Sequence, residues 1–162
     1  MLKVGDMAPP LDVHSDDGRF ITFSNLKGRW VLLYFYARLS SPGGRFQLQA
    51  FEREQVRFGS LGACVVGIGL DTEAMQARAR QKYEIGFPLI PDGGQTVHRR
   101  YRPRGFLQQL QRFYPRVVWI NPEGKIAAQY TETNRAKVVS HALQTLQTLQ
   151  KSFKEGPKHE PL

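Results

Sequence analysis

The stretch Trp30-Val31-Leu32-Leu33-Tyr34-Phe35-Tyr36 is a continuous apolar run. A half-buried strand alternates between apolar and polar residues, whereas a strand buried on both faces does not, and central parallel strands are of the second kind. We therefore expect the central strand of the fold here. Pro42-Gly43-Gly44 then breaks the pattern. A helix is expected over Phe46 to Phe58, where apolar residues recur between charges (Leu48, Phe51 and Val56).

The segments on either side of this run alternate between strands and helices. A second buried strand is expected over Ala63 to Leu70, and a helix capped by Asp71-Thr72 runs to about Tyr83. The other expected elements are an N-terminal β-hairpin (Leu11 to His14 with Arg19 to Phe23), a short strand (Phe87 to Ile90), a second hairpin (Arg116 to Ile120 with Lys125 to Tyr130) and a final helix (Arg135 to Phe153). This order predicts an α/β fold with a mixed central sheet flanked by helices.

Length and composition limit the class of protein. The 162 residues are 41% hydrophobic, which fits one globular domain, and no apolar run is long enough to span a membrane. We expect the domain to cover residues 1–154 and the tail 155–162 to be disordered. Cys64 is the single cysteine, which excludes an internal disulfide, and the first ten residues lack the apolar core of a signal peptide. We therefore expect a cytoplasmic protein without a membrane partner, either a monomer or a homodimer.

The net charge of +9 is concentrated between His98 and Arg116. Arginines and aromatic residues alternate in this segment, and it contains no acidic residue (Arg99, Arg100, Tyr101, Arg102, Arg104, Phe106, Arg112, Phe113, Tyr114 and Arg116). The simplest interpretation is a solvated basic loop. The alternative is binding of a single-stranded nucleic acid through Arg99, Arg100, Arg102 and Arg104, with bases stacked on the aromatic rings.

Several local sequences resemble the landmarks of the alkyl hydroperoxide reductase and thiol-specific antioxidant family, in the same order and spacing. They are Val4-Gly5-Asp6-Met7-Ala8-Pro9, Asp17-Gly18, Leu26-Lys27-Gly28-Arg29, Gly67-Ile68-Gly69-Leu70-Asp71, Phe87-Pro88-Leu89-Ile90 and Ile120-Asn121-Pro122-Glu123-Gly124-Lys125-Ile126. The resemblance is greatest to the bacterioferritin-comigratory type of peroxiredoxin and covers about Val4 to Leu149. It implies a thioredoxin-like fold and descent from antioxidant oxidoreductases.

The catalytic positions of that family differ here. Where the resemblance implies the cysteine that attacks peroxide, the chain has Gly44, and Gln49 stands at the resolving position. In an alternative alignment with thiol-disulfide oxidoreductases, the two cysteine positions fall on Ser40 and Gly43, in Ser40-Ser41-Pro42-Gly43. Peroxide reduction needs a thiolate that forms a sulfenic acid, and neither glycine nor serine supplies one. We therefore expect no catalytic residue at this degenerate site.

Cys64 lies within the expected strand Ala63 to Leu70. In such a setting a cysteine acts as a small hydrophobic residue, and its thiol is less acidic than in water. The alternative is an antioxidant enzyme that uses Cys64 with an external thiol.

His14 with Asp12, Asp16 and Asp17 suggests a metal site, but turn residues solvated by water explain the same pattern. We expect neither a metal nor a cofactor.

What remains of the site is a loop at a helix N-terminus, where Ser40 or Ser41 is expected to cap the helix. The functional alternative is an anion-binding loop. The candidate ligands of a carboxylate or phosphate are Arg38, Ser41, Gly43, Gly44, Arg45, Pro115 and Arg116. The resemblance implies a cis peptide before Pro115, and a catalytic arginine at the same position. Arg116 comes one residue later, which turns its side chain to the other face of a strand. The primary hypothesis is thus a peroxiredoxin-like pseudoenzyme, a scaffold for an anionic ligand or a protein partner.

Overall fold

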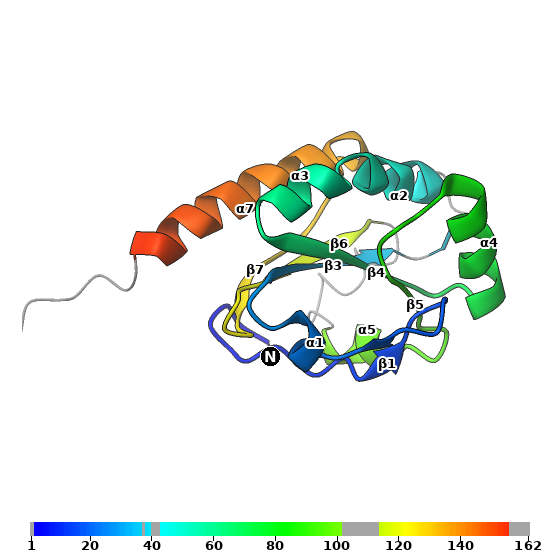
Figure 1. Cartoon of the computed structure of the whole chain (residues 1–162), viewed down its shortest axis with the longest axis horizontal. Helices are drawn as coiled ribbons and strands as arrows, with labels where there is room; N and C mark the ends of the chain where they lie inside the picture. Colours follow the sequence, from blue (N-terminus) through cyan, green and yellow to red (C-terminus); the bar gives the residue numbers. More distant parts are fainter. Residues whose placement is uncertain (1, 37, 40–42, 102–113, 156–162) are drawn as a thin grey trace, which may run out of the picture.

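The run Trp30–Tyr36 forms the central strand β3 in the computed structural model, which describes residues 2–36, 38–39, 43–101 and 114–155 (Figure 1). Strands β4 (Ala63–Gly69) and β5 (Leu89–Pro91) extend the sheet in parallel on one side of β3. Strands β6 (Arg116–Ile120) and β7 (Ile126–Thr131) extend it antiparallel on the other side. The order β5-β4-β3-β6-β7 confirms the predicted mixed sheet.

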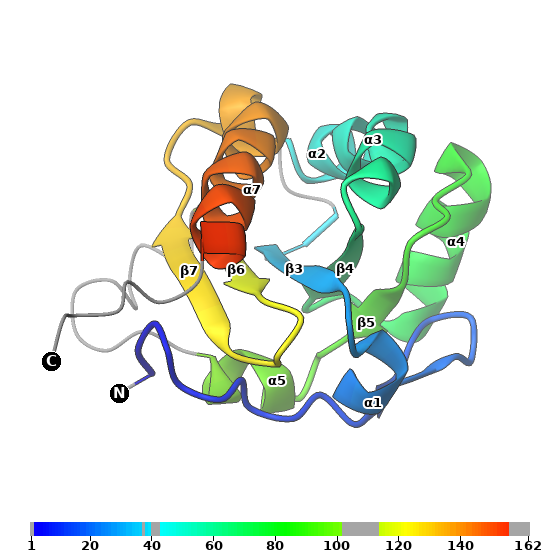
Figure 2. The same cartoon turned by 60° about the vertical axis from the view of Figure 1, so that its left-hand side comes forward.

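Helices cover one face of this sheet, and shorter elements cover the other. Helices α2 (Gly44–Arg53), α3 (Gln55–Ser60) and α7 (Val138–Glu155) lie on the first face, and α4 (Glu73–Tyr83) lies beside β5 (Figures 1 and 2). Helices α1 (Phe23–Leu26) and α5 (Thr96–Arg100) lie on the second face, with strands β1 (Val13–His14) and β2 (Phe20–Ile21) on the same side of the molecule. The predicted N-terminal hairpin is thereby confirmed.

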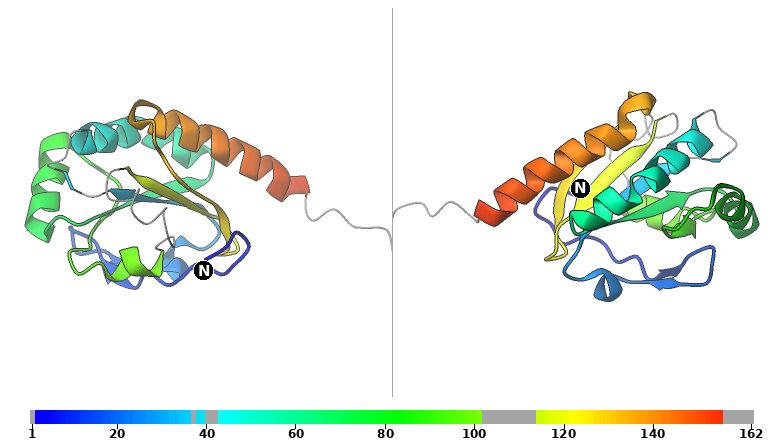
Figure 3. Two further views of the ribbon diagram at one scale, coloured as in Figure 1. Left: turned by 180° about the vertical axis from the view of Figure 1, so that it is seen from behind. Right: turned by 45° about the horizontal axis from the view of Figure 1, so that its top comes forward.

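Strand β3 is buried on both faces because its side chains alternate between two cores. Leu32, Tyr34 and Tyr36 pack toward α2, α3 and α7, whereas Val31, Leu33 and Phe35 pack toward α5 and the N-terminal segment. Figure 3 shows α7 and the α2–α3 pair side by side along the first face. No helix in the described ranges is long and apolar enough to cross a membrane.

Three predicted elements differ from the structure in more than a terminal residue or two, and one helix was not predicted. The helix expected over Phe46 to Phe58 is two helices, because the chain leaves helical geometry at Glu54 (φ −100°, ψ 9°). Phe23 begins α1 after the cap residue Thr22 and does not end a strand. The final helix starts as a short 3-10 turn, η1 (Arg135–Lys137), before α7. Helix α5 is an element that the sequence analysis did not predict.

The carboxyl end of β4 is shaped by two glycines that make room for Tyr36. A Cβ atom on Gly69 would stand 2.3 Å from the Tyr36 ring, because the two residues are partners in the parallel register. The Tyr36 hydroxyl accepts a hydrogen bond from Gln76 of α4 at 3.0 Å. Tyr36 therefore joins the end of the central strand to α4.

The turn between β1 and β2 is fixed to α4 by a buried ion pair. Arg80 donates to both carboxylate oxygens of Asp16, at 2.6 Å each, and the Asp16 side chain has no exposed surface. The expectation that water solvates Asp16 at this turn is wrong, because the chain brings α4 over it. Among the described residues, no group of three or more metal-binding side chains is present near it or elsewhere.

Candidate functional site

The N-terminus of α2 begins at two glycines. Gly43 is the N-cap residue with a positive φ of 89°, a conformation that favours glycine, and Gly44 is buried as the first helical residue. The Gln47 amide donates to the Gly43 carbonyl at 2.8 Å, but the N-cap supplies no side-chain hydrogen bond. The first amides of a helix lack intrahelical acceptors, and the helix dipole is positive there. This end of α2 therefore suits an anion.

Arg135 brings a positive charge to the same end of α2. Its Cδ atom lies 3.6 Å from the position that a Cβ on Gly43 would occupy, so a side chain at residue 43 would touch it. The Arg135 guanidinium lies over the Tyr114 ring, 5.3 Å from its centroid. Arg135 is not among the site residues predicted from the sequence. The sequence offers one signal for it: Arg135 stands at the start of the final helix, where a positive charge is unfavourable because it opposes the helix dipole.

Two buried polar side chains lie behind this end of α2. The Tyr34 hydroxyl donates to the Gln47 side-chain carbonyl, and both residues are almost fully buried. Burial raises the pKa of Tyr34 well above its usual value, although the positive charge of Arg135 opposes the shift. Tyr34 therefore stays neutral and orients Gln47, without a role as an acid near neutral pH.

Arg116 lies on the other face of the sheet from α2. Its neighbours in β6 alternate: Val117 and Trp119 pack in the core beneath α2 and α7, and Val118 and Ile120 pack in the opposite core. The buried Arg116 side chain donates to Gln129, whose own amide donates to the Leu2 carbonyl at 2.8 Å. Burial lowers the pKa of Arg116 to about 10. The structure thus separates Arg116 from Gly43 and Gly44.

The peptide before Pro115 is trans, since the described residues contain no cis peptide bond. The expectation of a cis bond, taken from the family resemblance, is therefore wrong. Pro115 is buried at the start of β6, and its carbonyl accepts a hydrogen bond from the Glu132 amide at 2.8 Å. Its role in this structure is to connect β6 with the chain beyond β7.

The segment between β3 and α2 is held by a buried carboxylate. Asp71, at the end of β4, accepts a hydrogen bond from the Leu39 amide at 2.7 Å. Burial raises the pKa of Asp71, although the Leu39 amide and the charge of Arg38 oppose the shift.

Of the other candidate residues, Arg38 and Arg45 are both exposed, and Gln49 is partly exposed on α2. The candidates Ser40, Ser41 and Pro42 lie outside the described residues.

Comparison with known proteins establishes the family. The family model described as AhpC/TSA matches residues 4–129. The chain belongs to the AhpC/TSA family. It is 24% identical to peroxiredoxin Bcp of Bacillus subtilis over 91% of this chain and 95% of that protein. It is 31% identical to the chloroplastic peroxiredoxin Q of Oryza sativa subsp. japonica, over 90% of this chain and 66% of that protein.

Solved structures agree with the family assignment. The peroxidoxin BcpB of Mycobacterium tuberculosis has a TM-score of 0.76 at 25% identity, with 93% of this chain and 98% of that chain covered. The yeast mitochondrial 1-Cys peroxiredoxin has a TM-score of 0.82 at 21% identity, with 99% of this chain and 84% of that chain covered. The second likeness is evidence for the thioredoxin-like fold alone.

In this AhpC/TSA-family chain, Cys64 lies at the far end of the sheet from the N-terminus of α2. It pairs with Val31 near the start of β3, whereas α2 follows the end of β3 beyond Tyr36. Tyr36 lies five residues beyond Val31 along the strand, which is about 16 Å at ~3.3 Å per residue. Burial raises the pKa of the partly buried Cys64 thiol, although Arg29 opposes the shift. Cys64 therefore has neither the position nor the acidity of the family's nucleophile.

Two described residues of the basic segment, Arg100 and Tyr101, are hydrogen-bonded to the N-terminal segment. Arg100 donates to the Pro10 carbonyl at 2.9 Å, and the buried Tyr101 donates to the Pro9 carbonyl at 2.5 Å. Arg99 is exposed on α5. The other two arginines of the nucleic-acid hypothesis, Arg102 and Arg104, lie outside the described residues. Binding of nucleic acid remains a prediction.

Proposed function

We propose that this chain retains the scaffold of a thiol peroxidase without its chemistry, and that it binds an anionic ligand at the N-terminus of α2. The observation that carries the proposal is Gly44, the first residue of α2, at the place of the family's reactive cysteine. Peroxide reduction begins with attack by a thiolate at such a helix terminus. A glycine has no side chain with which to attack.

Peroxide reduction is the second candidate function, and family membership favours it. It would have to use Cys64, the only thiol of the chain. The thiolate is the reactive form, so a raised pKa leaves less of it near neutral pH. Cys64 also lies about 16 Å along the sheet from the end of β3 that precedes the N-terminus of α2, which removes it from the positive end of the helix dipole. Both observations favour binding over catalysis.

The binding proposal uses three features of the α2 terminus. The first-turn amides offer hydrogen-bond donors, the helix dipole favours negative charge, and Arg135 adds a full positive charge beside Gly43. The absent Cβ atoms at Gly43 and Gly44 let a ligand approach the backbone closely. A carboxylate or a phosphate fits this set of donors.

Titration with acetate, followed by the amide resonances of the 15N-labelled chain at constant ionic strength, tests the proposal. We expect saturable shifts at Gly44, Arg45 and Phe46, because their amides are the donors. Replacing Arg135 by glutamine is expected to weaken acetate binding about threefold, the size of effect typical of an exposed charge pair.

The matched control is Lys137→Gln, which removes one positive charge from the same 3-10 turn at another exposed position. This control is expected to leave the acetate affinity unchanged within error. Acetate shifts that do not saturate, or that are equally weakened by both substitutions, would overturn the proposed site.

A further inference from the structure

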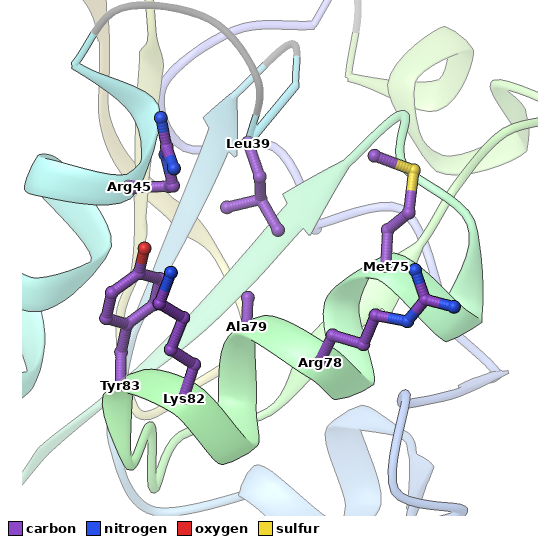
Figure 4. A pocket seen from close by; sticks show the side chains of 7 residues that line it. All are labelled: Leu39, Arg45, Met75, Arg78, Ala79, Lys82 and Tyr83. Atoms are coloured by element: carbon purple, nitrogen blue, oxygen red, sulfur yellow. The ribbon is translucent and has the colours of Figure 1, made fainter.

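A pocket of about 350 Å³ lies between α2 and α4 (Figure 4). Its apolar lining is Leu39, Met75, Ala79 and Tyr83, and its polar lining consists of three basic residues, Arg45, Arg78 and Lys82. Ligand pockets in proteins are typically concave and mostly apolar, with a few placed polar groups. The volume of this pocket lies in the range of ligand pockets, and its lining combines apolar and basic side chains in a groove that is open to solvent.

The apolar part of the pocket results from the spacing of residues on α4. Met75, Ala79 and Tyr83 follow each other at intervals of four residues, which places them on adjoining turns of one helix face. Ala79 is small and buried, so it leaves space beneath the buried Leu39 side chain, which reaches over it from the β3–α2 segment (Figure 4). The hydrogen bond from the Leu39 amide to Asp71 fixes that segment.

The charges of the pocket are all positive. Arg45 comes from the first turn of α2, and Arg78 and Lys82 come from α4, whereas none of the described residues that line the pocket is acidic. Within the described ranges, neither Arg45 nor Arg78 takes part in an ion pair. Arg80 on the same helix lies outside the pocket and is paired with Asp16 of the β1–β2 turn, so its charge is neutralised. Three cations around one cavity attract a negatively charged group.

We propose that this pocket binds an aliphatic monocarboxylate, with its chain between Leu39, Met75 and Ala79 and its carboxylate among the three basic side chains. The inference rests on the proposed function, because it names the class of anion that the scaffold binds. Arg45 belongs to both the α2 terminus and the pocket, since its amide lies in the first turn of α2 and its side chain lines the pocket. A ligand with only a charge would leave the apolar lining unused.

The affinities of a chain-length series (acetate, butanoate, hexanoate and octanoate) for the full chain test the inference, measured by the same amide shifts. We expect the affinity to rise about fourfold for each methylene group that the pocket buries, until the pocket is full. Met75→Gln is expected to reduce the gain per methylene, because it replaces an apolar contact. Arg78→Gln is expected to weaken every member of the series about threefold.

Ala77→Glu is the matched control for Arg78→Gln, because it changes the net charge by the same amount at an exposed position on α4 outside the pocket lining. This control is expected to preserve both the affinity and the chain-length dependence. If octanoate binds no more tightly than acetate, or if the control weakens binding as much as Arg78→Gln, the inference is wrong while the α2 site stands. If acetate and octanoate both fail to bind, the proposed function fails with it.

Discussion

Replacing Arg80 by methionine is expected to lower the free energy of unfolding by about 3–5 kcal/mol, because it leaves the buried Asp16 carboxylate without its partner. Asp16 has no exposed side-chain surface, and both of its carboxylate oxygens accept hydrogen bonds from Arg80 at 2.6 Å. Arg80 also donates to the Phe87 carbonyl at 2.8 Å, which would lose this donor. Urea denaturation followed by tryptophan fluorescence measures the effect.

Two further variants distinguish the contribution of the ion pair to the free energy of unfolding from the effect of losing a surface charge. Arg78→Met changes the same charge on the same helix at an exposed position, and we expect its effect to stay within about 0.5 kcal/mol. The double variant Asp16→Asn/Arg80→Met is expected to lose less stability than the two single variants together, since the two residues interact directly. Equal losses for Arg80→Met and Arg78→Met would show that the ion pair does not stabilise the fold.

Gly69→Ala is expected to lower the free energy of unfolding by about 1–3 kcal/mol, because the new methyl group would overlap the Tyr36 ring. A Cβ atom on Gly69 would lie 2.3 Å from Tyr36 Cε2. The ring is nearly buried and stacks on Tyr34 at a centroid distance of 5.7 Å, so it has little room to move away. The same denaturation experiment applies.

Gly59→Ala is the matched control for this substitution. Gly59 lies in α3, and a Cβ atom there would meet no atom within 4 Å. Alanine is the better helix former, so the control is expected to be neutral or to stabilise the chain by up to about 1 kcal/mol. A Gly69→Ala chain as stable as this control would contradict the packing of Tyr36 against β4.

The central sheet could be predicted because its signal is local. The uninterrupted apolar run Trp30–Tyr36 and the turn Asn121-Pro122-Glu123-Gly124 each specify an element within a few residues. The break at Glu54 was not predicted, because the apolar spacing around it continues as in a single helix. Helix α5 was missed because five residues are too few to show a helical period.

The candidate site was predictable only where one short segment defines it. Gly43 and Gly44 could be placed at a helix N-terminus from the sequence around them. Arg135 could not be placed beside them, because the contact depends on how α7 packs against α2, far apart in the sequence. The pocket residues of α4 could not be predicted for the same reason, since Arg45 and Arg78 line one pocket only in the folded chain.

The rate of hydrogen peroxide consumption by the purified chain with excess dithiothreitol, measured beside the Cys64→Ser variant, tests whether the chain reduces peroxide. Because Gly44 supplies no thiol and Cys64 lies at the far end of the sheet from the N-terminus of α2 with a raised pKa, we expect no turnover above that of the variant. Turnover that disappears in Cys64→Ser would identify Cys64 as the nucleophile and contradict the account. Turnover that persists in the variant would contradict it as well, since the scaffold would then carry another peroxide-reducing chemistry.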